Sequence, residues 1–166
     1  PATRLPSSAA FASLEAPSHG LFAASADVEC AFYHLLLPEG MDSMFTLPSI
    51  SVDILVALGL GGLDYPPGAR VTPRVRVLPM GFSWAFWLAQ AAHEEVTRRA
   101  LGAGKPLVID RQPAPCLRHG SSVMIYADNG NHIGLDKAEV DRDRQVCEAE
   151  LRKYRLAVHD VCEGET

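Results

Sequence analysis

Two apolar runs of strand length each end in an aspartate, and these two ends constrain the fold more than any other feature of the chain. Asp27 follows LFAASA, and Asp128 follows VMIYA. Because a strand alternates its side chains between two faces, a carboxylate at its end leaves the core while the preceding residues stay buried. If the two strands are neighbours, the carboxylates supply the hard oxygen ligands that Mg²⁺ prefers, with positions left for water and phosphate. The pattern predicts a Mg²⁺ or Mn²⁺ site suited to phosphoryl transfer.

Three segments stand in a fixed order along the chain. They are SADVECAFYHLLLP (residues 25–38), VLPMGFSWAFWLAQ (residues 77–90) and MIYADNGNHIG (residues 124–134). In this order they resemble the first catalytic motif, the substrate-positioning motif and the third motif of the reverse transcriptases. FTLPS at residues 45–49 continues the first motif in the manner of that family. The resemblance implies that residues 21–166 are the palm domain of an RNA-directed DNA polymerase, a nucleotidyltransferase, from a retrotransposon or other retroelement.

The resemblance assigns the catalytic positions to Asp27, Asp128 and Asn129, with Asp27 and Asp128 as the metal ligands. It implies addition of deoxynucleotides to a primer by two-metal phosphoryl transfer, with Mg²⁺ or Mn²⁺ as the cofactor. The expected partners are an RNA or DNA template-primer and a dNTP. Taken alone, Asp27 is typical of a helix N-cap, and Asp128 with Asn129 before a glycine is typical of a turn. The three motifs together favour the metal site, although the turn interpretation stays open for Asn129.

A second set of residues is implied to contact substrate. The resemblance places the backbone of Val28 beside the incoming triphosphate and Phe32 as a steric gate against a ribose 2′ hydroxyl. Met80 and Gly81 would lie under the nascent base pair, where glycine lets a backbone approach closely. Gln90, further along the same helix, would be a supporting polar residue.

Three departures from the family pattern weigh against catalysis. Asn129 stands where the family usually has a second aspartate, which removes one negative charge from the metal site. Phe86 stands where the second motif often has proline, and the closing stretch RLAVHDVCEG lacks the lysine of the fourth motif. In that stretch, His159 is a cation only when protonated. The other histidines form no ligand spacing and receive no role; they are His34, His93, His119 and His132.

Charge limits what the chain does by itself. Its formal net charge is −5, whereas proteins that follow a phosphate backbone neutralise it with Lys and Arg. In the family the basic grip lies largely in the fingers and thumb, which are absent here, so we expect a palm fragment of a larger polyprotein. Two alternatives stay open: a catalytically decayed retroelement remnant, and a non-enzymatic α/β module of the RNA-recognition kind. Against the RNA-recognition module, the predicted strands show no pair of exposed aromatic residues suited to base stacking.

Length and composition set the remaining expectations. At 166 residues the chain is expected to be one domain, with residues 1–20, rich in Pro, Ala and Ser, as a linker or disordered segment. No apolar run approaches the roughly 18 residues of a membrane span. The four cysteines show no disulfide or zinc spacing. These features predict a soluble intracellular protein, cytoplasmic or nuclear and not secreted.

Hydrophobic periodicity and turn residues predict an α+β fold of β-α-β-β-α-β order, the split βαβ arrangement of polymerase palms, with helices on one face of the sheet. The expected strands are residues 21–27, 44–47, 74–78, 122–128, 131–135 and 156–161. The expected helices are residues 31–37, a helix capped by Ser83 and ending near Leu101, and one opened by Asp136 and Glu139 and ending near Tyr154. Asn129 and Gly130 predict a type I′ hairpin turn. We expect Trp84 and Trp87 to be buried and residues 105–120 to form a surface loop, and we predict no shape for the insertion at 49–76.

Overall fold

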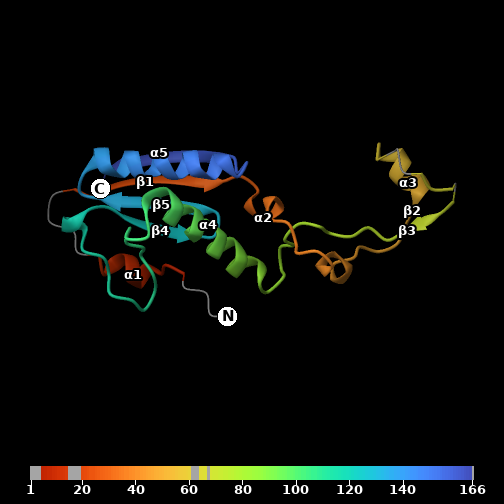
Figure 1. The fold of residues 1–166 in the computed structure, drawn as a ribbon, viewed down its shortest axis with the longest axis horizontal. Helices are drawn as coiled ribbons and strands as arrows, with labels where there is room; N and C mark the ends of the chain where they lie inside the picture. Colours follow the sequence, from red (N-terminus) through yellow and green to blue (C-terminus); the bar gives the residue numbers. More distant parts are fainter. Residues whose placement is uncertain (1–4, 15–19, 61–63, 67, 166) are drawn as a thin grey trace. The chain divides into compact units, whose positions relative to one another are not determined.

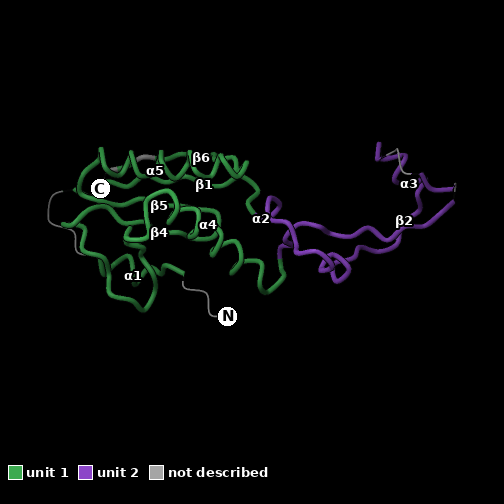
Figure 2. Tube along the Cα trace, viewed as in Figure 1, with its two compact units in different colours: residues 1–31, 81–166 green, residues 32–80 purple. Residues whose placement is uncertain are grey.

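The computed structural model describes residues 5–14, 20–60, 64–66 and 68–165, and it divides into two units. Unit 1 comprises residues 1–31 and 81–166, and unit 2 comprises residues 32–80 (Figure 2). The expectation of one domain, which rests on length, stays a prediction. No helix in the described part of the chain is both long enough and apolar enough to cross a bilayer.

Unit 1 is built on a four-stranded sheet (Figure 1). Its strands, in the order in which they lie side by side, are β4 (Ser122–Tyr126), β5 (Asn129–Gly134), β1 (Phe22–Val28) and β6 (Val158–Glu165), and all neighbours are antiparallel. The helix α4 (Ala85–Leu101) joins β1 to the hairpin of β4 and β5, and α5 (Lys137–Lys153) joins the hairpin to β6. The predicted α+β class and the β-α-β-β-α-β order of unit 1 are confirmed.

Alternation along β1 separates the two faces of the sheet. Ala24, Ala26 and Val28 are buried, whereas Ser25 and Asp27 between them are half-buried. Val28 packs with Val96 of α4 and Leu151 of α5, so the buried face is the one that the two long helices cover. We call the opposite face the open face. A carboxylate at Asp27 therefore lies outside the core, as the strand pattern predicted.

The long helices begin and end at identifiable residues. Asp136 caps α5, because its side chain accepts hydrogen bonds from the backbone N–H groups of Ala138 and Glu139. The predicted N-cap at Ser83 is wrong, since α4 begins after Trp84 and has no side-chain cap. Gly102 ends α4 with a φ of +89°, which only glycine adopts without strain.

Trp84 is also more exposed than predicted, with 49% of its surface accessible. Its ring meets Trp87 edge to face at 6.1 Å, and Trp87 is half-buried. The two rings shield one another at the start of α4 instead of entering the core, which corrects the expectation that both are buried.

The β4–β5 turn differs from the one that the Asn-Gly pair predicts. Tyr126 pairs with Asn129, so the two turn residues are Ala127 and Asp128, and Gly130 lies within β5. A Cβ atom at position 130 would lie 3.3 Å from the Nε2 atom of His93, tighter than most such contacts. The fit of β5 against α4 therefore outweighs the local preference of Asn-Gly for a turn, and Ala127 adopts a φ of +52°.

Unit 2 is an antiparallel ribbon with little regular structure. Its elements are the 3₁₀ turn η1 (Met41–Met44), β2 (Ile50–Ser51), α3 (Val52–Ala57) and β3 (Arg70–Val71). The strands predicted at 44–47 and 74–78 are wrong, because only isolated bridges pair Leu36 with Val77 and Thr46 with Arg74. The helix α2 (Ala31–His34) stops short of its predicted end, since the backbone beyond it pairs with residues 76 and 78.

Two connecting segments hold more structure than predicted. Within the expected linker, Ser7 caps the five-residue helix α1 (Ser8–Ala12) and donates a hydrogen bond to the Asp110 carboxylate at 2.6 Å. Residues 1–4 and 15–19 of that expected linker lie outside the described residues. The loop at 105–120 includes the short 3₁₀ helix η2 (Leu117–His119) and buries Val108.

Lys105 joins that loop to α5 through a buried polar cluster. Its ammonium group donates to the Ser121 hydroxyl at 2.5 Å and forms ion pairs with Asp143 and, at 3.2 Å, with Glu139. Ser121 also donates its hydroxyl to Asp143 at 2.6 Å. Burial by itself raises the pKa of Asp143, but the hydrogen bonds from Lys105 and Ser121 hold it below its ordinary value of 3.8. Among the described residues, Lys105 is thus the nearer and more buried of the two cations that pair with Asp143, the other being Arg142 at 3.8 Å.

We expect Lys105→Met to lower the free energy of unfolding by about 3 kcal/mol, because it removes the nearer cation of the buried Asp143 and leaves Arg142, whose Nε atom lies 3.8 Å from the carboxylate. Urea denaturation at neutral pH measures this loss. The matched control is Lys137→Met, which removes an exposed pair with Asp141 on the surface of α5 and should cost less than about 1 kcal/mol. Equal losses in the two variants would contradict a special role for Lys105.

His132 on β5 is the second unusual group under the sheet. It is 3% exposed, and its Nδ1 atom has no hydrogen-bond partner among the described residues. Burial lowers the pKa of His132 to about 4, with Asp143 acting in the opposite direction and His93, Lys105 and Arg144 adding to the decrease. The folded protein therefore keeps this imidazole neutral under conditions in which the unfolded chain protonates it.

This difference predicts a loss of stability in acid. The ordinary pKa of a histidine is 6.5, and that of His132 in the folded protein is about 4. As the pH falls between these values, the unfolded state binds a proton at His132 and the folded state does not. The shift corresponds to about 3 kcal/mol of lost stability at the lower end of that window. Urea denaturation at several pH values should show the loss in the parent and a markedly shallower one in His132→Leu. Identical pH dependence in the two proteins would rule out His132 as its source.

Candidate active site

The structure brings Asp27 and Asp128 to the same end of the sheet. Asp27 near the end of β1 pairs with Asn129 at the start of β5, so the hairpin tip lies beside the end of β1. The backbone N–H of Val28 donates to the carbonyl of Asp128 at 2.9 Å. Both aspartates are half-buried. The two strand ends are therefore neighbours, which is the condition for a metal site formed by the two aspartates.

One row of side chains crosses all four strands on the open face. In order across the sheet the row is Tyr126, Asn129, Asp27 and His159, as the strand registers pair them. Residues directly opposite in antiparallel strands share a face. His159, the residue considered in place of the family's lysine, is thus the cross-strand neighbour of Asp27 and is exposed. At the other end of the row, Tyr126 meets Phe86 of α4 edge to face at 5.4 Å.

Asn129 takes part in a local contact. Its side-chain oxygen accepts a hydrogen bond from the amide of Asn131 at 2.5 Å, two residues along β5 on the same face. Within the described residues no group of three or more His, Cys, Asp or Glu side chains is arranged to hold a metal ion. The donor set is therefore Asp27 and Asp128. One or two carboxylates, completed by water and substrate phosphates, match the needs of Mg²⁺, so these residues fit the implied cofactor.

Gln90 of α4 holds the hairpin backbone. It is 3% exposed, its side-chain oxygen accepts the N–H of Ala127 at 2.8 Å, and its amide donates to the carbonyl of Ile125 at 2.9 Å. The same amide nitrogen donates to Glu94 at 2.9 Å. Both ends of the Gln90 amide are thus engaged by the backbone of the hairpin. The supporting role beside the substrate that the resemblance implies for Gln90 stays a prediction.

His93 is a functional candidate that the sequence analysis missed. It lies one turn after Gln90 on α4, is buried, and has its Nδ1 atom 2.9 Å from the carbonyl of Ala127. Burial lowers the pKa of His93 below its ordinary value of 6.5, while the Ala127 carbonyl, Asp128, Asp27 and Glu94 act in the opposite direction. The ring is held neutral close to both aspartates. Only its spacing of three residues from Gln90 gave a signal, since i and i+3 share a helix face.

The remaining predicted residues are placed as follows. The N–H of Val28 is already bonded to Asp128, and its side chain is in the core. Gly81 belongs to unit 1 and is exposed with a φ of +93°. Phe32 and Met80 belong to unit 2, where Phe32 is half-buried and Met80 is exposed. The substrate contacts implied for these residues stay predictions.

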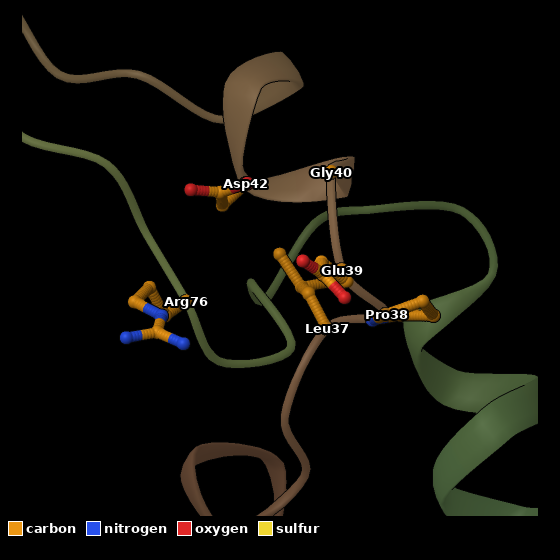
Figure 3. A pocket seen from close by; sticks show the side chains of 6 residues that line it. All are labelled: Leu37, Pro38, Glu39, Gly40, Asp42 and Arg76. Carbon is orange, nitrogen blue, oxygen red and sulfur yellow. The ribbon is translucent and has the colours of Figure 1, made fainter.

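Unit 2 has a surface pocket of its own. Figure 3 shows Glu39 and Asp42 on one segment of the chain and Arg76 on another. The other residues that line the pocket are Leu37, Pro38 and Gly40. Asp42 also pairs with Arg74 at 3.6 Å. None of the predicted catalytic residues lines this pocket, and its mixture of acidic and basic groups indicates no particular ligand.

Comparison with known proteins adds little. No family model matches the chain, and no curated protein matches it. Seventy chains of solved structures match, among them apo telomerase from Candida tropicalis, truncated from its C-terminal domain. That chain is 13% identical with a TM-score of 0.48, and the match covers 89% of this chain and 31% of the telomerase chain. A likeness this weak carries no argument about function.

Replacing Gln90 tests how much the hairpin depends on it. We expect Gln90→Leu to lower the free energy of unfolding by about 2–4 kcal/mol, because it leaves a buried N–H of Ala127 and a buried carbonyl of Ile125 without this partner. Chemical denaturation measures the loss. Gln145→Leu, at an exposed position of α5, is the matched control and should change stability by less than about 0.5 kcal/mol. A Gln90 variant as stable as the control would contradict the assignment.

Proposed function

We propose that this chain is the palm of an RNA-directed DNA polymerase of a retroelement, and that Asp27 and Asp128 are its metal ligands. The observation that carries the proposal is the pairing of β1 with β5, which brings the two half-buried aspartates to the same end of the sheet. The order of the three motifs supports the same function. The proposed partners are template-primer, a dNTP, and the fingers and thumb of a larger polyprotein.

Asp27 and Asp128 would hold Mg²⁺ or Mn²⁺, which when bound activates the attacking 3′ hydroxyl and stabilises the leaving pyrophosphate. The chain's own residues contribute position and charge. The carboxylates concentrate negative charge at one end of the sheet, where a cation reduces their mutual repulsion. His93 beneath them is neutral and adds no positive charge to oppose that cation. Gln90 keeps the hairpin that bears Asp128 in place.

A catalytically decayed copy of the same palm is the second candidate. The observation that favours it is Asn129, whose side-chain oxygen is engaged by Asn131 and whose amide brings no negative charge. Metal affinity then rests on two carboxylates where the family usually has a third. This candidate shares the fold and the site and differs only in whether the site still binds metal.

The RNA-recognition alternative receives less support from the open face. Domains of that kind stack bases on aromatic side chains of the central strands. In the described row the central strands carry Asn129 and Asp27, while Tyr126 and His159 lie on the edge strands. A carboxylate on a central strand repels nucleic-acid phosphate unless a cation is bound.

Titration of Mn²⁺ by calorimetry separates these candidates. We expect the parent to bind Mn²⁺ at one class of site, Asp27→Ala to abolish that binding, and Asn129→Asp to strengthen it by adding a charge beside Asp27. Asp141→Ala removes a carboxylate on the outer face of α5 and is the matched control, expected to bind like the parent.

Two results would count against an intact site. If the parent fails to bind but Asn129→Asp binds, the scaffold survives and the substitution has weakened it, as in a decayed copy. If Asp27→Ala binds Mn²⁺ as well as the parent and the Asp141→Ala control, the assignment of Asp27 as a ligand is wrong.

A further inference from the structure

Ala127 occupies an unfavourable backbone conformation at the tip of the hairpin. Its φ of +52° lies in the left-handed region, which costs a residue with a Cβ roughly 1–2 kcal/mol. Asp128 follows it directly, so the conformation of Ala127 sets where the Asp128 backbone continues. A strained residue persists only where its surroundings determine it, and the groups that hold Ala127 therefore also place Asp128.

Two residues of α4 hold Ala127 from opposite sides of its peptide groups. Gln90 accepts its N–H at 2.8 Å, and the Nδ1 atom of His93 lies 2.9 Å from its carbonyl oxygen. A carbonyl oxygen only accepts hydrogen bonds, so the Nδ1 atom of a neutral His93 carries the proton and donates it. Both polar groups of Ala127 are thereby satisfied by side chains that stand one turn apart on one helix.

The His93 ring also contacts the hairpin beyond Asp128. A Cβ atom built on Gly130 would lie 3.3 Å from Nε2 and 3.4 Å from Cε1 of the ring. The ring therefore lies against bare backbone in β5, with its donor directed to Ala127. His93 touches the chain on both sides of Asp128 and Asn129, and a shift of the ring must shift the segment between its two contacts.

We propose that His93 is a positioning residue that holds the hairpin tip, and with it Asp128, in register with Asp27 for cation binding. The part of this inference that concerns the cation rests on the proposed function. His93 is buried beneath the hairpin and is not itself a ligand. Its effect passes through the Ala127 carbonyl and the Gly130 backbone to the carboxylate next to them.

The test compares His93→Asn with His93→Leu, two side chains of similar size that differ in having an N–H donor. The readouts are hydrogen exchange of the backbone amides at residues 126–130 and the affinity for Mn²⁺. We expect His93→Leu to speed exchange at Ala127 and Asp128 and to weaken Mn²⁺ binding about tenfold or more, the size of effect known for residues that orient metal ligands. His93→Asn should recover much of both. His132→Leu, at the other buried histidine under the sheet, should match the parent in both readouts.

A second pair of variants leaves His93 in place and serves if His93→Leu does not fold. Gly130→Ala crowds the ring, whereas Gly164→Ala on β6 adds a Cβ that meets nothing within 4 Å. We expect only Gly130→Ala to speed exchange at the hairpin tip and to weaken Mn²⁺ binding.

The two readouts separate failure of this inference from failure of the proposed function. Parent-like exchange and parent-like Mn²⁺ affinity in His93→Leu, or in Gly130→Ala if His93→Leu does not fold, would overturn the positioning role. If the parent binds no Mn²⁺, the metal assignment fails, and exchange at the tip alone decides whether His93 holds the hairpin. Faster exchange that His93→Asn does not reverse would assign the effect to packing and overturn the role of the donor.

Discussion

The pairing of β1 with β5 is the interaction on which the candidate site depends. It places Asp27 opposite Asn129, and the bond from the Val28 N–H to the Asp128 carbonyl closes the hairpin tip against the end of β1. A slip of one residue would turn Asp27 into the core and Val28 out of it, because side chains alternate along a strand. Val28 in the core with Val96 and Leu151 opposes that slip. The apolar packing beneath the sheet thus determines where the carboxylates stand above it.

Between the sheet and its helices the interior is unusually polar. Gln90 and His93 form hydrogen bonds with the hairpin backbone. The ion pair of Lys105 with Asp143 joins the loop before β4 to α5. Buried polar groups add to stability only when their bonds are complete, and they cost most when a partner is removed. The hydrogen bonds of Gln90 and His93 also specify one arrangement of the hairpin. A site that must hold two like charges close together benefits from such a framework, since the charges themselves favour separation.

Some of this arrangement could be predicted from the sequence, and the physical reasons differ from residue to residue. The strands ending near Asp27 and Asp128, and the cap of α5 at Asp136, follow from local patterns that the structure keeps. The turn at Ala127 and Asp128 could not be predicted from local sequence. Gly130 lies within β5 because the His93 ring leaves little room for a Cβ atom there, and this contact exists only once α4 packs on β5. His93 was missed because its spacing of three residues from Gln90 is its only signal, and that spacing does not separate a positioning residue from an ordinary core histidine. Unit 2 was missed because its ribbon pairs through short strands and isolated bridges, which leave no period in the sequence.

The central claim is that Asp27 and Asp128 together form a cation site at the end of the β1–β5 pair. Anomalous diffraction from a crystal grown or soaked with Mn²⁺ tests it most directly, because it locates the ion without reference to activity. The account predicts a Mn²⁺ peak within about 2–2.5 Å of a carboxylate oxygen of each aspartate, with water completing the shell. A fully occupied peak elsewhere, with none between Asp27 and Asp128, would contradict it.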